Sequence, residues 1–137
     1  MELKFRAWDK DNNSMFYSED NQSDDFTFIG EKDGLQFYHI DENRYLKDTN
    51  SVLMQYTGLT DKNGVEIFEG DILRLLNSDV LCEVVYEAPS FCRRWLNSKV
   101  SNVRGVEMES MAHNTHIAYE VIGNICENED LLEEYKK

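Results

Sequence analysis

Proline and cysteine are both scarce in this sequence of 137 residues. Its single proline, Pro89, cannot donate a hydrogen bond to a strand ladder, so we expect it to end the strand predicted at residues 80–86. The three cysteines are odd in number, widely spaced and set in apolar surroundings, which favours reduced core thiols over a disulfide framework. They are Cys82, Cys92 and Cys126.

Long apolar runs are missing as well. No window approaches the roughly 18 consecutive apolar residues that a membrane-spanning helix needs. The N-terminal stretch MELKFRAWDK has no apolar core of the length typical of a signal peptide. The sequence therefore predicts a cytoplasmic protein without a membrane partner.

Basic residues are few, because 14 Lys and Arg residues stand against 27 Asp and Glu residues, for a net charge of -13. Such a surface repels phosphate backbones, so general nucleic-acid binding by counterion release is not expected. The hydrophobic share of 41%, with 12% aromatic residues, is too high for a disordered chain. The length suits one compact domain, or a small domain with an appendage.

Signatures of common enzyme classes are also lacking. The sequence has no Gly-rich phosphate loop, no Ser nucleophile elbow and no cysteine pair at metal-binding spacing. We therefore assign no catalytic residues and no cofactor, and we expect a protein that is not an enzyme.

What the sequence does contain is many short strand signals, which alternate in polarity or are rich in aromatic and β-branched residues. We predict strands at residues 3–8, 15–17, 26–29, 35–40, 52–56, 65–68, 72–76, 80–86, 91–96, 100–108 and 117–122. After the last strand, Asn128 is a good N-cap for a short helix that begins at Glu129. These elements predict a mainly β fold (a β-rich α+β class), with a small, partly open barrel.

The most structured stretch is residues 56–74, YTGLTDKNGVEIFEGDILR. Asn63 and Gly64 lie between apolar runs and form a strong hairpin signal, because both residue types tolerate positive φ. Gly70 interrupts the next apolar run and predicts a bulge or sharp bend between two strands. We therefore expect Asn63, Gly64, Gly70 and Asp71 to be structural turn residues.

The acids of this stretch, Glu66, Glu69 and Asp71, could in principle act as paired carboxylates in acid–base catalysis or hold a divalent ion. Successive side chains of a strand point to opposite faces, and acids beside a glycine turn are ordinarily solvated turn formers. We favour the turn interpretation and expect Asp71→Asn to change little beyond local turn stability.

A polar segment at residues 41–50 ends in Asp48-Thr49-Asn50 and is the best candidate for a boundary. We predict an N-terminal β-hairpin region at residues 1–50. Residues 51–137 are predicted to form a barrel-like domain that carries the short C-terminal helix.

One weak metal-site pattern is present. Glu109, His113 and His116 are spaced by four and three residues, which would place them towards one face of a helix. Asn114 and Thr115 favour a turn instead, and no close pair of cysteines completes a ligand set. Solvated surface histidines are the alternative interpretation.

A basic cluster with aromatic residues follows Pro89. If residues 91–96 form a strand, Phe91, Arg93 and Trp95 share one face. This combination is typical of single-stranded nucleic-acid binding, but it is equally suited to a protein interface, where Arg and Trp are enriched. We regard these three residues as a candidate interaction patch and nucleic acid as the less favoured partner.

Three segments carry a family resemblance: KFRAWD near the start, LMQYTGLTDKNGVEIFEGDIL in the middle and YEVIGNICENEDLL near the end. In their order, they resemble the YopX family of phage and prophage proteins. The resemblance implies a small protein encoded in phage or prophage genomes, with a mainly β, SH3-like barrel and no established activity. It carries over no catalytic residues.

Together these observations favour a non-enzymatic, oligomeric protein-interaction module in the cytoplasm of an infected bacterial host. Its partner would be a second copy, as a homo-oligomer, or a host or phage protein. The net charge leaves open an acidic mimic of nucleic acid or an inhibitor of a basic host protein. A metal-dependent enzyme that uses Glu109, His113 and His116, or the acids around Gly70, is the third alternative.

Overall fold

The computed structural model describes residues 3–20, 25–87, 90–96, 108–111 and 118–131, with only the backbone described at 108–110. The chain forms two compact units, Glu2–Gln55 and Tyr56–Lys137. The division lies within strand β6 (Ser51–Thr60), C-terminal to the boundary expected from the polar segment. In the described residues, no helix is both long and apolar enough to cross a membrane.

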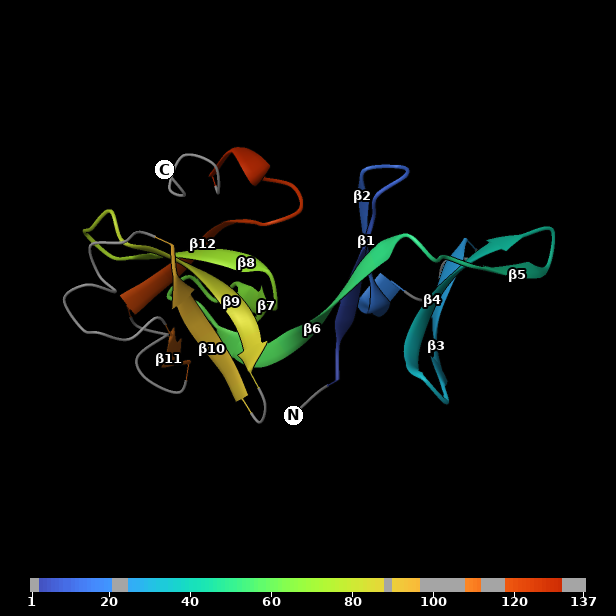
Figure 1. Cartoon of the computed structure of the whole chain (residues 1–137), viewed down its shortest axis with the longest axis horizontal. Coiled ribbons are helices and arrows are strands. Elements are labelled where there is room, and N and C mark those ends of the chain that lie inside the picture. The colour runs from blue at the N-terminus through green and yellow to red at the C-terminus, as the bar shows by residue number, and fades with distance from the viewer. Residues whose placement is uncertain (1–2, 21–24, 88–89, 97–107, 112–117, 132–137) are drawn as a thin grey trace. The chain divides into compact units, whose positions relative to one another are not determined.

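The first unit contains antiparallel strands throughout its described part (Figure 1). Strand β1 lies between β2 and the N-terminal half of β6, and a second sheet has the order β3-β4-β5. A 3-10 turn at Ser18–Asp20 follows β2. The strand bounds are β1 Phe5–Asp9, β2 Ser14–Tyr17, β3 Phe26–Glu31, β4 Gly34–Asp41 and β5 Arg44–Lys47.

Aromatic side chains build the core of this unit. Ala7, Phe26 and Phe37 are buried, and Phe16 and Phe28 pack against them. The ring centroids of Phe16 and Phe26 lie 4.9 Å apart, and those of Phe28 and Phe37 lie 5.1 Å apart, in tilted arrangements that aromatic pairs favour. The core therefore joins β1 and β2 to β3 and β4.

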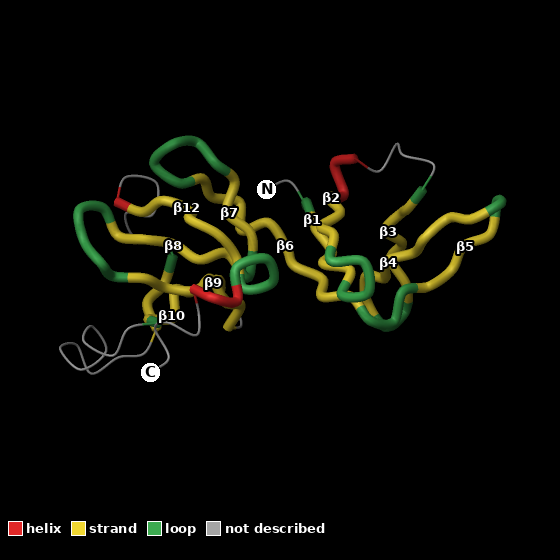
Figure 2. The backbone as a smooth tube through the Cα atoms, turned by 90° about the horizontal axis from the view of Figure 1, so that it is seen from above, coloured by secondary structure: helices red, strands yellow, loops and turns green. Residues whose placement is uncertain are grey.

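Strand β5 was not predicted, and it lies within the polar segment at residues 41–50 that the sequence marks as a candidate boundary. Glu42 and Asn43 have φ angles of 48° and 65° and form a two-residue turn, after which Arg44 pairs with Asp41. Two consecutive positive φ angles are typical of the tight turns whose twist matches a hairpin. The segment therefore folds as a hairpin with β4, and Figure 2 shows the two strands running together.

The second unit is a curled half-barrel of antiparallel strands (Figures 1 and 2), which confirms the predicted mainly β class and partly open barrel. Its sheet has the order β11-β10-β9-β8-β12, while the C-terminal half of β6 pairs with β7. The strand bounds are β7 Glu66–Phe68, β8 Asp71–Leu75, β9 Leu81–Glu87, β10 Ser90–Trp95, β11 Met108–Ser110 and β12 Tyr119–Asn124.

A short helical segment follows β12 and begins at Glu129, as predicted. The backbone oxygen of Asn128 accepts a hydrogen bond from the N–H of Leu131. The side-chain oxygen of Asn128 instead accepts the N–H of Asn124, at 3.0 Å. Asn128 thus links the end of β12 to the start of the helix.

Two turns organise the stretch at residues 56–74. Gly64 has a φ of +81° and donates its N–H to the carbonyl of Asp61. Gly70 has a φ of +89° and lies in the turn between β7 and β8, where its N–H bonds to the carbonyl of Val84. Both positions have backbone conformations that glycine adopts without strain.

The expectation that the acids around Gly70 are solvated is wrong for Asp71. This residue is 2% exposed, and its Oδ2 accepts the backbone N–H of Phe68 at 2.8 Å. The N–H belongs to the last residue of β7, so the carboxylate bridges the turn that Gly70 makes. Asp71 is a buried structural residue because it satisfies a backbone donor that the turn would otherwise leave open.

Candidate functional site

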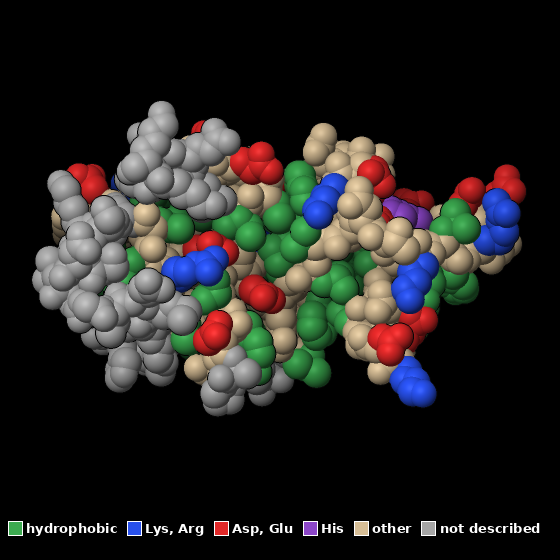
Figure 3. Space-filling model, in the orientation of Figure 1, with side chains coloured by type: hydrophobic (Ala, Val, Ile, Leu, Met, Phe, Trp, Pro, Cys, Tyr) green, Lys and Arg blue, Asp and Glu red, His purple; other side chains and the backbone are tan. Residues whose placement is uncertain are grey.

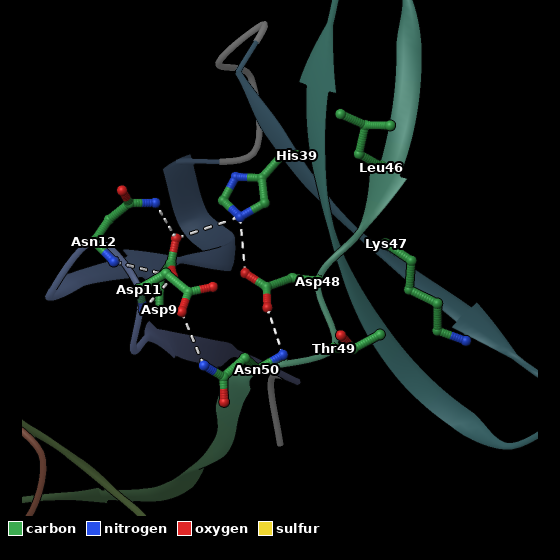
Figure 4. Close-up of a pocket in the computed structure, with 9 residues that line it drawn as sticks. All are labelled: Asp9, Asp11, Asn12, His39, Leu46, Lys47, Asp48, Thr49 and Asn50. Carbon is green, nitrogen blue, oxygen red and sulfur yellow. Dashed lines mark hydrogen bonds and ion pairs between the residues drawn. The ribbon is translucent and has the colours of Figure 1, made fainter.

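The first unit has a pocket of about 320 Å³ where the end of β1 and the β1–β2 turn face β4 and the end of β5 (Figure 4). Charged and amide side chains dominate its lining, together with one threonine and one leucine. The lining residues are Asp9, Asp11, Asn12, His39, Leu46, Lys47, Asp48, Thr49 and Asn50.

Three ionisable side chains meet at this pocket from three different elements. Asp9 is the last residue of β1, His39 lies within β4, and Asp48 directly follows β5. His39 Nε2 lies 2.8 Å from Asp48 Oδ2 and 3.3 Å from Asp9 Oδ2. Strand pairing brings the three together, since β4 pairs with β5 and the aromatic core joins β1 to β4.

The remaining carboxylate oxygens are held by the backbone. Asp9 Oδ1 accepts the N–H of Asp11 at 3.0 Å and that of Asn12 at 3.4 Å. Asp48 Oδ1 accepts the N–H of Asn50 at 2.8 Å. Each aspartate therefore closes its own local turn with Oδ1, and its Oδ2 is directed at the imidazole, as Figure 4 shows.

The two carboxylates of this cluster are largely shielded from water. The side chain of Asp9 is 1% exposed and that of Asp48 is 6% exposed, whereas His39 keeps 32%. Removing a carboxylate from water disfavours its charged form unless hydrogen bonds or opposite charges compensate. The cluster is thus a place where two acids share one basic neighbour.

The pKa of Asp48 reflects these opposing influences. Desolvation, the largest single influence, raises the pKa, but hydrogen bonds from the Asn50 N–H, His39 and Ser51 lower it, and so does the charge of His39. The net effect holds the pKa of the Asp48 carboxyl below its ordinary value. The site therefore favours a charged carboxylate at this position.

The predicted metal pattern Glu109, His113 and His116 does not coincide with this cluster. His113 and His116 lie outside the described residues. The backbone of Glu109 belongs to strand β11 and pairs with Arg93 of β10. The pattern required Glu109 to lie in a helix, and this expectation is wrong because Glu109 lies in a strand.

The predicted interaction patch Phe91, Arg93 and Trp95 needs a correction as well. The three residues do share one face of β10, but that face is the inner one: Phe91 and Trp95 pack against the buried core of the second unit. Arg93 is 1% exposed, and its guanidinium carbon lies 4.3 Å from the centre of the Tyr119 ring. Arg93 therefore belongs to the core, while Phe91 and Trp95 pack against the core with one side and stay partly exposed on the other.

Among the predicted turn residues, Asn63 and Gly64 lie in the hairpin turn after β6. Gly70 lies between β7 and β8, and Asp71 is the first residue of β8. The cluster of Asp9, His39 and Asp48 was not predicted from sequence. The available signals were the Asp-rich turn after β1 and the Asp48-Thr49-Asn50 turn, both of which predict a local structure without indicating that the two meet.

Comparison with known proteins identifies the family to which the chain belongs. The family model described as YopX protein matches residues 4–133. The crystal structure of protein EF1440 from Enterococcus faecalis is similar over 96% of this chain and 99% of that chain, with 31% sequence identity and a TM-score of 0.55. Protein YopX from Bacillus subtilis is similar over 96% of this chain and 97% of that chain, with 18% identity and a TM-score of 0.62. A search of curated proteins found no match. The chain belongs to the YopX family.

Proposed function

We propose that this protein is a non-enzymatic interaction module that binds an extended segment of a partner protein along strand β5. The observation that carries the proposal is the exposure of the whole strand, since all four of its residues are exposed. Tyr45 is 62% exposed and Leu46 is 46% exposed. Because neighbouring strand residues point to opposite faces, neither face of β5 is covered.

The backbone of β5 supports the same proposal. The strand is at the end of the sheet order β3-β4-β5, so in the described part of the chain it pairs with β4 on one side only. An edge strand presents a row of N–H and C=O groups to which an extended segment can add as a further strand. Main-chain hydrogen bonds would supply affinity, and contacts with Tyr45 and Leu46 would supply specificity.

The charges on β5 indicate the chemistry of the partner. Arg44 and Lys47 flank the apolar pair, and Figure 3 shows basic and acidic side chains beside apolar ones around the β4–β5 hairpin. Their ion pairs, with Asp41 at 3.8 Å and Glu31 at 3.3 Å, are exposed and therefore weak. A partner strand with acids opposite both positions would complement them.

A second copy fits this edge less well. Antiparallel pairing of two β5 strands, centred on Tyr45 and Leu46, would place Arg44 opposite Lys47, and like charges directly opposite each other destabilise a sheet. The net charge of -13 adds repulsion between copies. We therefore favour a segment of another protein, with two apolar residues between two acids, over the homo-oligomer expected from the sequence.

The test uses a short synthetic peptide with the pattern acid, apolar, apolar, acid, titrated into the full chain and followed by backbone amide shifts in NMR. We expect the shifts to concentrate on β5, and to disappear in the double variant Tyr45→Ser, Leu46→Ser. A peptide with lysines in place of the acids is the matched control and should bind more weakly.

Several outcomes would overturn the proposal. Equal binding of the acidic and basic peptides, or shifts that avoid β5, would remove its basis. A concentration-dependent dimer that the double variant abolishes would identify a second copy as the occupant. Circular dichroism of the double variant checks that the fold is intact, which is expected because both side chains are exposed.

A further inference from the structure

We infer that Asp9, His39 and Asp48 form a binding site for a divalent transition-metal ion of the Zn²⁺ type. The inference goes beyond the proposed interaction along β5 and depends on a different set of side chains. One imidazole nitrogen and two carboxylate oxygens would be the ligands, and the pocket would give access to the remaining coordination position.

The two distances from His39 Nε2 to the carboxylate oxygens are close to those between the ligands of such an ion. The candidate atoms of the three residues all lie within 4.8 Å of one another. A tetrahedral Zn²⁺ with ligands at about 2.0–2.2 Å places those ligands about 3.4 Å from one another. The Asp9 Oδ2 to His39 Nε2 distance of 3.3 Å matches this value, and the Asp48 Oδ2 to His39 Nε2 distance of 2.8 Å needs a small expansion.

The hydrogen bonding around His39 points in the same direction. Nε2 of an imidazole carries at most one hydrogen; it is hydrogen-bonded to Asp48 Oδ2 at 2.8 Å, while Asp9 Oδ2 faces the same nitrogen at 3.3 Å without a hydrogen bond to it. A single N–H can make a well-aligned bond to only one of them. A cation between the three atoms satisfies both carboxylates and the nitrogen lone pair at once.

Charge balance gives an independent argument. Asp9 and Asp48 are almost fully buried side chains, with exposures of 1% and 6%. Even a protonated imidazole supplies one positive charge against two negative ones, so a negative charge remains in a place of restricted hydration. A divalent cation bound by a neutral imidazole and two carboxylates leaves the site without net charge.

The surroundings hold the two aspartates in a ligating orientation. Backbone N–H groups of Asp11, Asn12 and Asn50 occupy the Oδ1 atoms, so each carboxylate offers Oδ2 as a single ligand atom. Asn12 Nδ2 adds a bond of 2.7 Å to Asp9 Oδ2. Hydrogen bonds of this kind to ligating side chains are characteristic of metal sites in proteins, where they fix the ligand geometry.

The donor set selects among metals. An imidazole with two carboxylates suits Zn²⁺ and related first-row ions, whereas Ca²⁺ and Mg²⁺ prefer oxygen ligands throughout. Thiolate-preferring ions are disfavoured, because none of the three ligands is a cysteine. Three protein ligands leave a fourth position for water or an exogenous group at the pocket.

The experiment uses the full chain, purified without an affinity tag and freed of metal. Calorimetric titration with ZnCl₂ should show a site of one ion per chain, and Mg²⁺ at the same concentration should not compete. His39→Gln and Asp48→Asn should each weaken this site at least tenfold. Asp33→Asn is the matched control, since Asp33 is an exposed acid in the β3–β4 turn.

A second readout separates binding from folding. Zn²⁺ should raise the melting temperature of the wild type and of Asp33→Asn, and it should leave those of His39→Gln and Asp48→Asn nearly unchanged. Circular dichroism confirms that each variant is folded before titration. The inference fails if the wild type binds no Zn²⁺, or if both ligand variants bind it as tightly as the control does.

Discussion

Asp61 is hydrogen-bonded to Val121, 60 residues farther along the chain, through its Oδ2 atom and the backbone N–H of β12 at 2.9 Å. The other carboxylate oxygen accepts the N–H groups of Asn63 and Val65, at 2.8 and 2.9 Å. A side chain that is 3% exposed therefore satisfies three backbone donors. It joins the hairpin turn after β6 to the edge of the half-barrel sheet.

We expect Asp61→Ala to lower the free energy of unfolding by about 3 kcal/mol, because it leaves buried backbone donors without an acceptor. Urea unfolding followed by circular dichroism measures this change. Glu87→Gln, at an exposed acid of β9, is the control and should change the stability by no more than about 0.5 kcal/mol. Equal stability of the two variants would show that water replaces the lost acceptor.

Gly70→Val should be strongly destabilising, by about 2 kcal/mol or more, since a β-branched residue is strained at a φ of +89°. The turn cannot easily relax, because the Gly70 carbonyl also accepts the N–H of Ile125 at 2.9 Å. Gly30→Val is a matched control in a strand, where an added Cβ meets no heavy atom within 4 Å. Thermal unfolding compares the two, and similar melting temperatures would contradict the prediction.

Asp71→Ala should cost about 1–3 kcal/mol, because the N–H of Phe68 loses its acceptor in a buried turn. Glu66→Gln, which removes a charge from a partly exposed strand residue, should be close to neutral. Chemical denaturation of both variants decides between this expectation and a solvated turn, for which the two changes would be equally mild.

Tyr38→Phe should raise the pKa of Glu31. The Tyr38 hydroxyl donates to Glu31 Oε1 at 2.6 Å. This hydrogen bond is the largest single reason that the pKa of Glu31 lies below the ordinary value of 4.5. Desolvation opposes it by raising the pKa, and the hydrogen bond and charge of Lys47 lower the pKa further. A lowered carboxyl pKa stabilises the fold above pH 4.5, and this contribution is lost as the pH falls through the folded-state pKa.

Carbon-detected NMR titration of the Glu31 carboxyl measures this effect directly. The wild type should titrate below 4.5, and Tyr38→Phe should titrate closer to it. Lys47→Met should shift the pKa in the same direction, since it removes a hydrogen bond and a positive charge that both lower the pKa of Glu31. An unchanged Glu31 pKa in Tyr38→Phe would mean that the hydrogen bond does not persist in solution.

Much of the fold could be predicted because its strands alternate in polarity and its turns carry Asn, Asp and Gly. Strand β5 was not predicted, because alternation in polarity arises only where one face of a strand is buried. Residues 44–47 are exposed on both faces. Its turn has the non-glycine residues Glu42 and Asn43 at positive φ, of which only Asn43 is a usual turn signal.

The functional residues were harder to predict for a different reason. Alternation correctly placed Phe91, Arg93 and Trp95 on one face of a strand, but it could not indicate that an arginine belongs to the core, where the ring of Tyr119 lies against it. Asp9 and Asp48 belong to separate turns. Only the packing of β1 against β4 and the pairing of β4 with β5 bring them to His39.

The shared strand β6 has a consequence for how this family can be recombined. Residues from Ser51 to Gln55 pair with β1, whereas Tyr56 and Thr60 pair with β7. A chimera whose sequence changes from one family member to another at the division between the units would join two halves of β6 from different proteins. One half would be adapted to β1 of its own protein and the other to β7 of its own protein. Chimeras of YopX relatives should therefore inherit Ser51–Thr60 whole, together with both strands that pair with it.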